Sequence, residues 1–263
     1  MSNNKLKQAL EEKRQAGESI IVPYIMAGDG GLDVLEDRLT ILHEAGAAAV
    51  ELGIPFSDPV ADGPTIQEAG KRALENGTTL SGVLGTLKTI KRSVPIILMT
   101  YLNPIYAYGL EKFARDCAEA DVNGVIIPDL PIEEEDVITG YLKEYQISSI
   151  RLAAMTSPDE RLAMIAGRTE GFLYAVSVTG TTGARASHGA NVKTYLKKLS
   201  GKTNTPVLAG FGVSTSAQAR ELAADCDGVV IGSTIVNLFY EGKSEEVKKL
   251  IRESSLPVRP VTS

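Results

Sequence analysis

The sequence has few cysteines and histidines and no long hydrophobic run. The two cysteines, Cys117 and Cys226, and the two histidines form no CxxC pair and no spacing typical of a zinc site. No run approaches the roughly 18 apolar residues that cross a bilayer, and the polar start MSNNKLKQALEEKRQ is unlike a secretion signal. We therefore expect a cytoplasmic protein in a reduced compartment, with no metal site and no membrane contact.

Positive charge is also scarce. The chain carries 27 Lys and Arg against 33 Asp and Glu, a net charge of −6, and no basic block is interleaved with aromatic residues. The electrostatic field of this negative net charge repels a polyanion, so we do not expect nucleic acid as a partner. A small phosphorylated ligand stays compatible with this charge, because backbone N–H groups hold phosphate without a net positive charge.

Short apolar runs alternate with stretches that have helical spacing of apolar residues. Several of the runs are apolar on both faces, which is typical of a covered parallel sheet. The expected strands are Ser19–Met26, Ala48–Leu52, Val94–Tyr101, Gly124–Ile127, Ser148–Ala153, Gly171–Ser177, Thr205–Ala209 and Gly228–Ile231. The clearest expected helices are Leu32–Ala45, Leu110–Ala120, Glu133–Tyr145, Asp159–Ala166 and Ser216–Ala224.

This alternation fits either an open doubly wound sheet or a closed barrel. Eight repeats, and no GxGxxG turn after the first strand, favour an α/β (β/α)8 TIM barrel. An extra N-terminal helix, Lys5–Arg14, is expected to cap the N-terminal end of the barrel, and Thr65–Arg92 to hold two helices. No linker composition divides the chain, so residues 1–263 are predicted to form one domain.

The segment Glu51–Gln67, ELGIPFSDPVADGPTIQ, is the richest in candidate functional residues. Glu51 interrupts an apolar strand, and burial of an ionised carboxylate is costly without a partner. The residue therefore has either a chemical task or a salt bridge to a neighbouring strand. Asp62 is either functional or an N-terminal helix cap before Pro64. Asp58, before Pro59, is typical of a turn.

Three further segments follow expected strands at the barrel end where active sites form. Gly210–Ser214 and Gly232–Thr234 follow strands seven and eight and open helices, which favours phosphate binding over plain turns. Tyr174 precedes the small-residue loop Val178–Ala190, which is either a lid that excludes water or a disordered loop. His188 in this loop is expected to be solvent-exposed rather than catalytic.

The segment Glu51–Gln67 resembles the signature of the tryptophan synthase alpha chain family. The resemblance continues in order and spacing over nearly the whole chain, through Met99–Pro104, Pro128–Pro131, Tyr174–Gly183, Gly210–Gly212 and Gly232–Ser233. It implies a (β/α)8 barrel lyase that cleaves indole-3-glycerol phosphate to indole and glyceraldehyde 3-phosphate by a retro-aldol reaction in tryptophan biosynthesis.

The resemblance also implies roles for individual residues. Glu51 would be the general acid-base group, Asp62 would accept a hydrogen bond from the indole N–H, and Tyr174 would lie beside Glu51. Thr182 would belong to the closing loop and contact Asp62. The residues implied to surround the indole ring are Tyr24, Met99, Tyr101 and Ile126. Those implied to hold the phosphate are Gly183, Gly212, Gly232 and Ser233.

Proton transfer requires an acid with a pKa near working pH. We therefore expect the apolar strand to raise the pKa of Glu51, whereas Asp62 must stay ionised. Thr181, Arg151 and Ala154 depart from the family pattern and bear on the loop and the indole wall. Neither a lysine nor a histidine occurs among the expected strand-end residues, which disfavours other phosphate-binding barrels.

The resemblance implies a beta-chain partner, which holds pyridoxal phosphate, in a tetramer of two alpha and two beta chains. No cofactor is expected in this chain itself. Asp129 and the loops at Pro55–Pro59, Asn103–Pro104 and Pro131 would form the contact surface, and Ile105–Tyr106 is compatible with it. The alternative is a stand-alone indole-3-glycerol-phosphate lyase without a beta partner.

Overall fold

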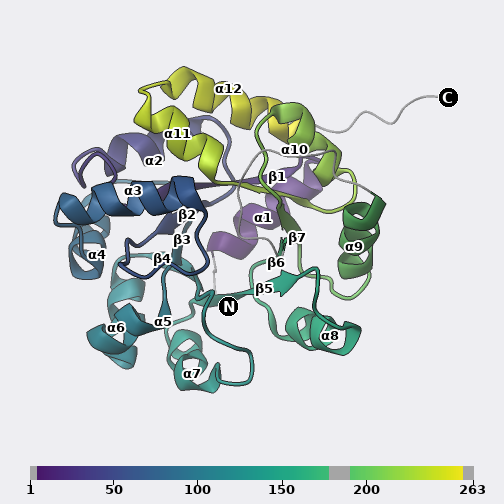
Figure 1. The fold of residues 1–263 in the computed structure, drawn as a ribbon, viewed down its shortest axis with the longest axis horizontal. Coiled ribbons are helices and arrows are strands. Elements are labelled where there is room, and N and C mark those ends of the chain that lie inside the picture. The colour runs from purple at the N-terminus through teal and green to yellow at the C-terminus, as the bar shows by residue number, and fades with distance from the viewer. Residues whose placement is uncertain (1–4, 178–189, 257–263) are drawn as a thin grey trace.

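Eight parallel strands close into one barrel in the order of the sequence, β1 to β8 (Figure 1). The computed structural model describes residues 5–177 and 190–256. The strands are β1 Ile20–Met26, β2 Val50–Gly53, β3 Ile96–Met99, β4 Val122–Ile126, β5 Ser148–Ala154, β6 Leu173–Val176, β7 Val207–Gly210 and β8 Gly228–Ile231. The predicted (β/α)8 fold is confirmed.

Helices form a ring around the strands (Figure 1). They are α1 Lys5–Gln15, α2 Leu35–Glu44, α3 Pro64–Glu75, α4 Leu80–Thr89, α5 Leu102–Tyr108, α6 Leu110–Glu119, α7 Asp136–Glu144, α8 Asp159–Arg168, α9 Ala190–Ser200, α10 Ser216–Ala223, α11 Ser233–Tyr240 and α12 Ser244–Ser255. The two helices expected in Thr65–Arg92 are confirmed. The third strand is shorter than predicted, because Tyr101 leaves the ladder to become the N-cap of α5.

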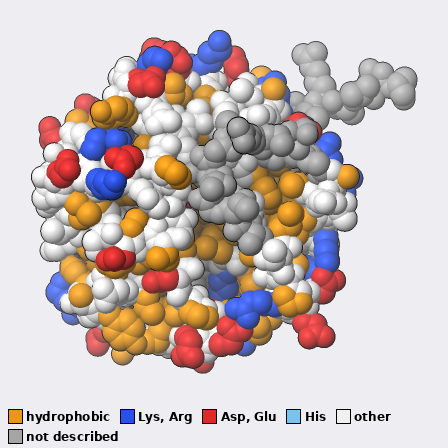
Figure 2. All heavy atoms as spheres, in the orientation of Figure 1, with side chains coloured by type: hydrophobic (Ala, Val, Ile, Leu, Met, Phe, Trp, Pro, Cys, Tyr) orange, Lys and Arg blue, Asp and Glu red, His pale blue; other side chains and the backbone are white. Residues whose placement is uncertain are grey.

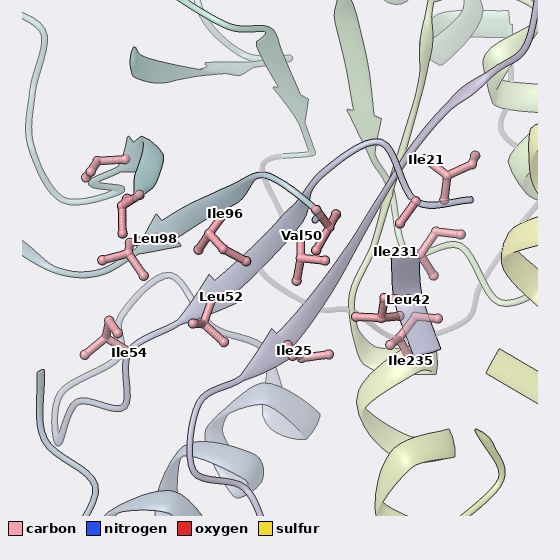
Figure 3. Close-up of a cluster of buried hydrophobic side chains, with 14 of the residues drawn as sticks. Ile21, Ile25, Leu42, Val50, Leu52, Ile54, Ile96, Leu98, Ile231 and Ile235 are labelled. Carbon is pink, nitrogen blue, oxygen red and sulfur yellow. The ribbon is translucent and has the colours of Figure 1, made fainter. Parts of the chain in front are cut away.

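The strands are apolar on both faces because each face meets a different core. Side chains such as Val50, Leu52 and Leu98 point outward and pack under the helices (Figure 3). Residues on the other face, including Val22 and Ile97, fill the barrel interior. Burial of both faces explains why these strands lack the alternation of a half-exposed sheet.

The extra N-terminal helix closes one end of the barrel, as predicted. Leu6 and Leu10 of α1 are fully buried against the interior core. Gly171, just before β6, has φ +69°, and a Cβ there would lie 3.0 Å from Leu6 Cδ2. With this end closed, a ligand enters at the opposite end, where the strands finish. Within residues 5–177 and 190–256, no helix is both long and apolar enough to cross a membrane.

Candidate active site

A cavity of about 140 Å³ opens at the C-terminal ends of the strands. Its walls come from strands β1, β2, β3, β6, β7 and β8, from the β2–α3 loop and the start of α3, and from the segments that follow β7 and β8. The lining residues are Tyr24, Glu51, Ala61, Asp62, Gly63, Ile66, Met99, Tyr174, Gly210, Gly212, Val213, Ser214, Val230, Gly232, Ser233 and Thr234. No lysine, arginine or histidine is among the described residues that line the cavity.

Glu51 lies on the interior face of β2, level with Tyr24 of β1 and Ile97 of β3. Its side chain is buried, and its Oε2 atom has no hydrogen-bond partner among the described residues. The alternative that Glu51 forms a salt bridge to a neighbouring strand is therefore wrong within the described residues. Burial, assisted by the nearby charge of Asp62, raises the pKa of Glu51 to about 8, in the expected direction.

Asp62 lies in the loop between β2 and α3. Helix α3 begins at Pro64 with Gly63 as its N-cap and no side-chain cap bond, so the alternative that Asp62 caps this helix is wrong. Burial raises the pKa of Asp62 to about 6, and a hydrogen bond with Tyr101 opposes that rise. Both carboxyls are thus shifted upward, but Asp62 stays the more acidic and is mainly ionised at neutral pH.

The other polar residues of this loop are in a turn. Asp58 accepts a hydrogen bond from Ser57 Oγ at 2.5 Å, and its carbonyl accepts one from Val60 N. The turn predicted at Asp58 is confirmed. Its side chain is exposed and is not part of the cavity wall.

Two tyrosines act on Glu51: Tyr24 is buried and Tyr174 is partly buried. Tyr24 donates a weak hydrogen bond to Met26 Sδ at 3.9 Å, and Tyr174 packs against Phe172 with ring centroids 5.8 Å apart. Burial raises the pKa of both tyrosines further above the ordinary value, and the two carboxylates add to that rise. Both phenols therefore stay protonated and can donate hydrogen bonds at neutral pH.

The far end of the cavity has the features of an anion site. Gly212 has φ +66°, a conformation that favours glycine, in the loop after β7. Helix α11 begins at Ser233, directly after Gly232, and Ser233 Oγ is buried with no hydrogen-bond partner among the described residues. Free amides, a helix N-terminus and an unpaired hydroxyl together suit a phosphate group.

The structure separates the four residues expected around an indole ring. Tyr24 and Met99 line the cavity. Tyr101 lies behind the wall, where its phenol contacts the Asp62 loop. Ile126, which pairs with Met99 in the β3–β4 register, is fully buried in the interior core and does not line the described cavity wall. Thr182, Gly183, Thr181 and His188 lie outside the described residues, so their expected roles stay predictions.

The sequence analysis assigned no role to Ile66, and it did not predict how the loops after β7 and β8 are joined. Ile66 belongs to the buried face of α3, where its spacing is that of an ordinary core residue. Val213 and Thr234 are joined by a hydrogen bond from Thr234 Oγ1 to the Val213 carbonyl at 2.7 Å, which ties together the loops after β7 and β8. Val213 and Thr234 belong to the two glycine segments that the sequence singled out, Gly210–Ser214 and Gly232–Thr234, but only the fold brings these segments together.

The two departures in the fifth strand lie away from the cavity. Arg151 points outward from β5, and its Nε lies 2.6 Å from Glu135 Oε2 at the start of α7. Ala154 is the last residue of β5 and is not part of the described cavity wall. Neither residue forms a wall for the ligand. Among the described residues, no cluster of His, Cys, Asp or Glu could hold a metal ion.

Comparisons with known proteins agree with this geometry. The family model described as "Tryptophan synthase alpha chain" matches residues 10–260. The chain is 59% identical to a tryptophan synthase alpha chain of Oceanobacillus iheyensis, covering 97% of this chain and 98% of that one. It is 49% identical to one from Bacillus cereus, covering 95% and 96% of the two chains. The chain belongs to the tryptophan synthase alpha chain family.

The structural comparison extends this result to the fold. A chain of Mycobacterium tuberculosis tryptophan synthase superposes with a TM-score of 0.89 at 33% identity, over 97% of this chain and 98% of that chain. The tryptophan synthase alpha chain resemblance read from Glu51–Gln67 is therefore confirmed at the level of the family and the fold. The cavity occupies the place in the barrel where enzymes of this fold carry their active sites.

Proposed function

We propose that this cavity cleaves indole-3-glycerol phosphate to indole and glyceraldehyde 3-phosphate, the alpha reaction of tryptophan biosynthesis. The observation that carries the proposal is the placement of Glu51. It is a buried carboxyl whose Oε2 has no hydrogen-bond partner among the described residues, in a cavity that also has the features of an anion site. An unpaired buried carboxyl destabilises the fold, so its presence at a cavity wall favours a chemical role.

In the proposed mechanism Glu51 acts first as an acid. It donates its proton to C3 of the indole ring, which becomes a positively charged indolenine. The resulting Glu51 carboxylate takes the proton of the hydroxyl on the adjoining side-chain carbon. The carbon–carbon bond then breaks, its electron pair restores indole, and the hydroxyl carbon becomes the aldehyde. Glu51 ends protonated, ready for another turnover.

Asp62 stabilises the charge that develops on the ring. Its carboxylate would accept a hydrogen bond from the indole N–H, and this bond strengthens as the ring becomes cationic. The pKa of about 6 at Asp62 and the pKa of about 8 at Glu51 support this division. At a pH between these two values Asp62 is mainly ionised and Glu51 is mainly protonated, as the mechanism requires.

The remaining contacts orient the substrate. The amides near Gly212 and Gly232, with the Ser233 hydroxyl, would hold the phosphate, and Gly183 would join them. Tyr24 and Met99 would contact the indole ring, with Tyr101 and Ile126 supporting that wall from behind. Tyr174 would donate a hydrogen bond beside Glu51, and Thr182 would contact Asp62. These contacts fix the reacting carbon beside the acid, which lowers the entropic part of the barrier.

A beta chain is the partner of tryptophan synthase alpha chains, and it is the proposed partner here, in a tetramer of two alpha and two beta chains. Hydrophobic side chains gather over the region of α5 to α7 (Figure 2), where Tyr106 is 53% exposed. Val60 in the β2–α3 loop is 81% exposed. Such exposed apolar side chains near the cavity mouth suit a protein interface.

We further infer that residues 1–263 act as one catalytic domain in the cytoplasm, without a cofactor. Pyridoxal phosphate would belong to the beta chain. The alternative of a stand-alone lyase is not favoured by the family. It differs in one measurable property, because a stand-alone enzyme releases indole at full rate without a partner.

Indole release from indole-3-glycerol phosphate tests the proposal. We expect slow release by the chain alone and strong activation by a tryptophan synthase beta chain. Asp62→Asn should lower the rate at least 10-fold while leaving phosphate affinity near the wild-type value, because other residues form the proposed anion site. A wild-type rate in Asp62→Asn would contradict the proposed role of this carboxylate.

A further inference from the structure

We propose that Tyr101 is a positioning residue whose hydroxyl holds the Asp62 carboxylate toward the cavity. This inference rests on the proposed function, because Asp62 has a task only if a ring N–H binds there. Tyr101 does not line the cavity. Its effect on the reaction would therefore pass through Asp62 rather than through contact with the substrate.

The hydroxyl of Tyr101 has contacts that fix where its proton points. Its oxygen accepts a hydrogen bond from Ala61 N at 3.0 Å. Ala61 directly precedes Asp62, and the same hydroxyl is the hydrogen-bonding group that lowers the pKa of the Asp62 carboxyl. A carboxylate can only accept, so the phenolic proton is donated to Asp62 while the oxygen accepts from the backbone. One hydroxyl thus binds two successive residues of the β2–α3 loop.

The Tyr101 ring is itself held firmly. It is 2% exposed, and its centroid lies 5.3 Å from that of Phe56, which comes from the same β2–α3 loop. The next residue, Leu102, donates its N–H to Asp129 Oδ1 at 2.9 Å. The phenol therefore has little freedom to follow a carboxylate that rotates away, and a rigid donor is what orients a mobile acceptor.

The backbone of Asp62 does not depend on this bond. Its N–H donates to the Pro59 carbonyl at 3.0 Å, and its carbonyl accepts from Gln67 Nε2 at 2.8 Å. No salt bridge to Asp62 occurs among the described residues. Loss of the Tyr101 hydroxyl should therefore release the carboxylate while the loop keeps its course. This separation makes the proposal testable.

The electrostatic surroundings indicate the direction of the effect. Among the described residues, the charged and titratable groups that act on Asp62 and Tyr101 come from β1, β2, β6 and the loop after β4: Tyr24, Glu51, Tyr174 and Asp129. None of them is a cation. The hydrogen bond from Tyr101 is accordingly the contact that lowers the pKa of Asp62 against the rise caused by burial. Its removal should make Asp62 a weaker acid.

Tyr101→Phe removes one oxygen and keeps the ring packing against Phe56. We expect kcat for indole release to fall roughly 10- to 100-fold, the range of one hydrogen bond to a charged group, with KM changed less than about threefold. The acid limb of the rate profile should move to higher pH. In spectra of carboxyl-labelled protein, the Asp62 pKa should rise above its wild-type value of about 6.

Tyr108→Phe is the matched control. Tyr108 also donates a hydrogen bond to a carboxylate, Asp116 Oδ2 at 2.6 Å, but away from the described cavity wall. It should leave kcat and the Asp62 pKa unchanged. In an Asp62→Asn background, Tyr101→Phe should change the rate less than about twofold, because the group that it positions is no longer charged.

Two results would overturn the inference. One is a wild-type Asp62 pKa and acid limb in Tyr101→Phe. The other is an equal rate loss from Tyr101→Phe with and without Asp62→Asn, which would assign the phenol a role of its own. The proposed function fails separately, if Asp62→Asn alone keeps the wild-type rate. The carboxyl titration would still decide whether Tyr101 holds Asp62 in that case.

Discussion

Two buried glutamates of this barrel have opposite surroundings. Glu135, at the start of α7, is 8% exposed and pairs with Arg151 at 2.6 Å and with Arg168 at 3.1 Å. Glu51, inside β2, is 1% exposed and has no ion pair among the described residues. Arg151 donates further to the carbonyl of Ser149 at 3.0 Å, so the charges outside the barrel form a network.

The comparison separates stability from function. A buried carboxylate with two arginines is compensated, and its removal leaves the arginines without their partner. A buried carboxylate without a partner destabilises the fold at neutral pH, and instead gains a pKa near the pH at which proton transfer works best. Burial alone therefore does not identify a catalytic acid. A buried carboxyl at a cavity wall that has no ion pair does indicate one.

The largest expected effect is on the rate of the Glu51→Gln variant. We expect indole release to fall about 10²- to 10⁴-fold, the usual contribution of a general acid-base group, because the amide neither donates nor accepts the transferred proton. Steady-state kinetics with saturating beta chain measure this loss. Glu68→Gln, on the exposed side of α3, serves as a control with the wild-type rate. A near-normal rate in Glu51→Gln would remove the residue from the mechanism.

Glu135→Gln tests the paired side of the comparison. It should lower the free energy of unfolding by about 3 kcal/mol, because Arg151 stays buried without a carboxylate partner. Indole release per folded molecule should stay within about twofold of wild type, since the network lies outside the barrel. Denaturant unfolding measures the first quantity. Glu133→Gln breaks an exposed pair with Arg161 and should change stability by about 0–1 kcal/mol. Equal losses from the two variants would contradict the distinction.

The smallest expected effect is a gain of stability in Glu51→Gln at alkaline pH. The folded-state pKa of Glu51, about 8, lies above the unfolded value, so the folded chain binds the extra proton between them. The contribution of protonated Glu51 to the free energy of unfolding is fully present below the pKa of the unfolded chain. It is lost as pH rises toward and through 8. At pH 8.5 the variant should be more stable than wild type by roughly 1–3 kcal/mol, and near pH 4 by almost nothing. Urea unfolding at the two pH values checks it, and a pH-independent difference would contradict the assignment.

Much of the fold could be predicted, because apolar runs and helical spacing are local properties of the chain. The eight strands, the N-terminal helix and the two helices after β2 followed from these patterns. The misplaced strand end at Tyr101 shows their limit. A tyrosine after an apolar run continues a strand by pattern, whereas in the fold its backbone caps α5 and its phenol reaches the Asp62 loop.

The site was predictable where the residue type was unexpected for its position. Glu51 in an apolar strand and paired glycine turns after the last two strands indicated a function by themselves. Ile66 and Ile126 show the opposite case. By spacing both are core residues, yet Ile66 lines the described cavity wall and Ile126 does not. The pattern cannot separate them, because apolar spacing within α3 or β4 does not show which buried side chains border a cavity that other segments help to form.

The sequence by itself determined the alternation of strands and helices, the family, and which carboxylates stand in unusual positions. Hydrophobic periodicity and residue identity carry this information along the chain. Only the tertiary structure decided that, among the described residues, Glu51 has no ion-pair partner while Glu135 has two, and that Asp62 does not cap α3. Partners of a buried charge come from segments far apart in the sequence, and closure of the barrel is what brings them together or keeps them apart.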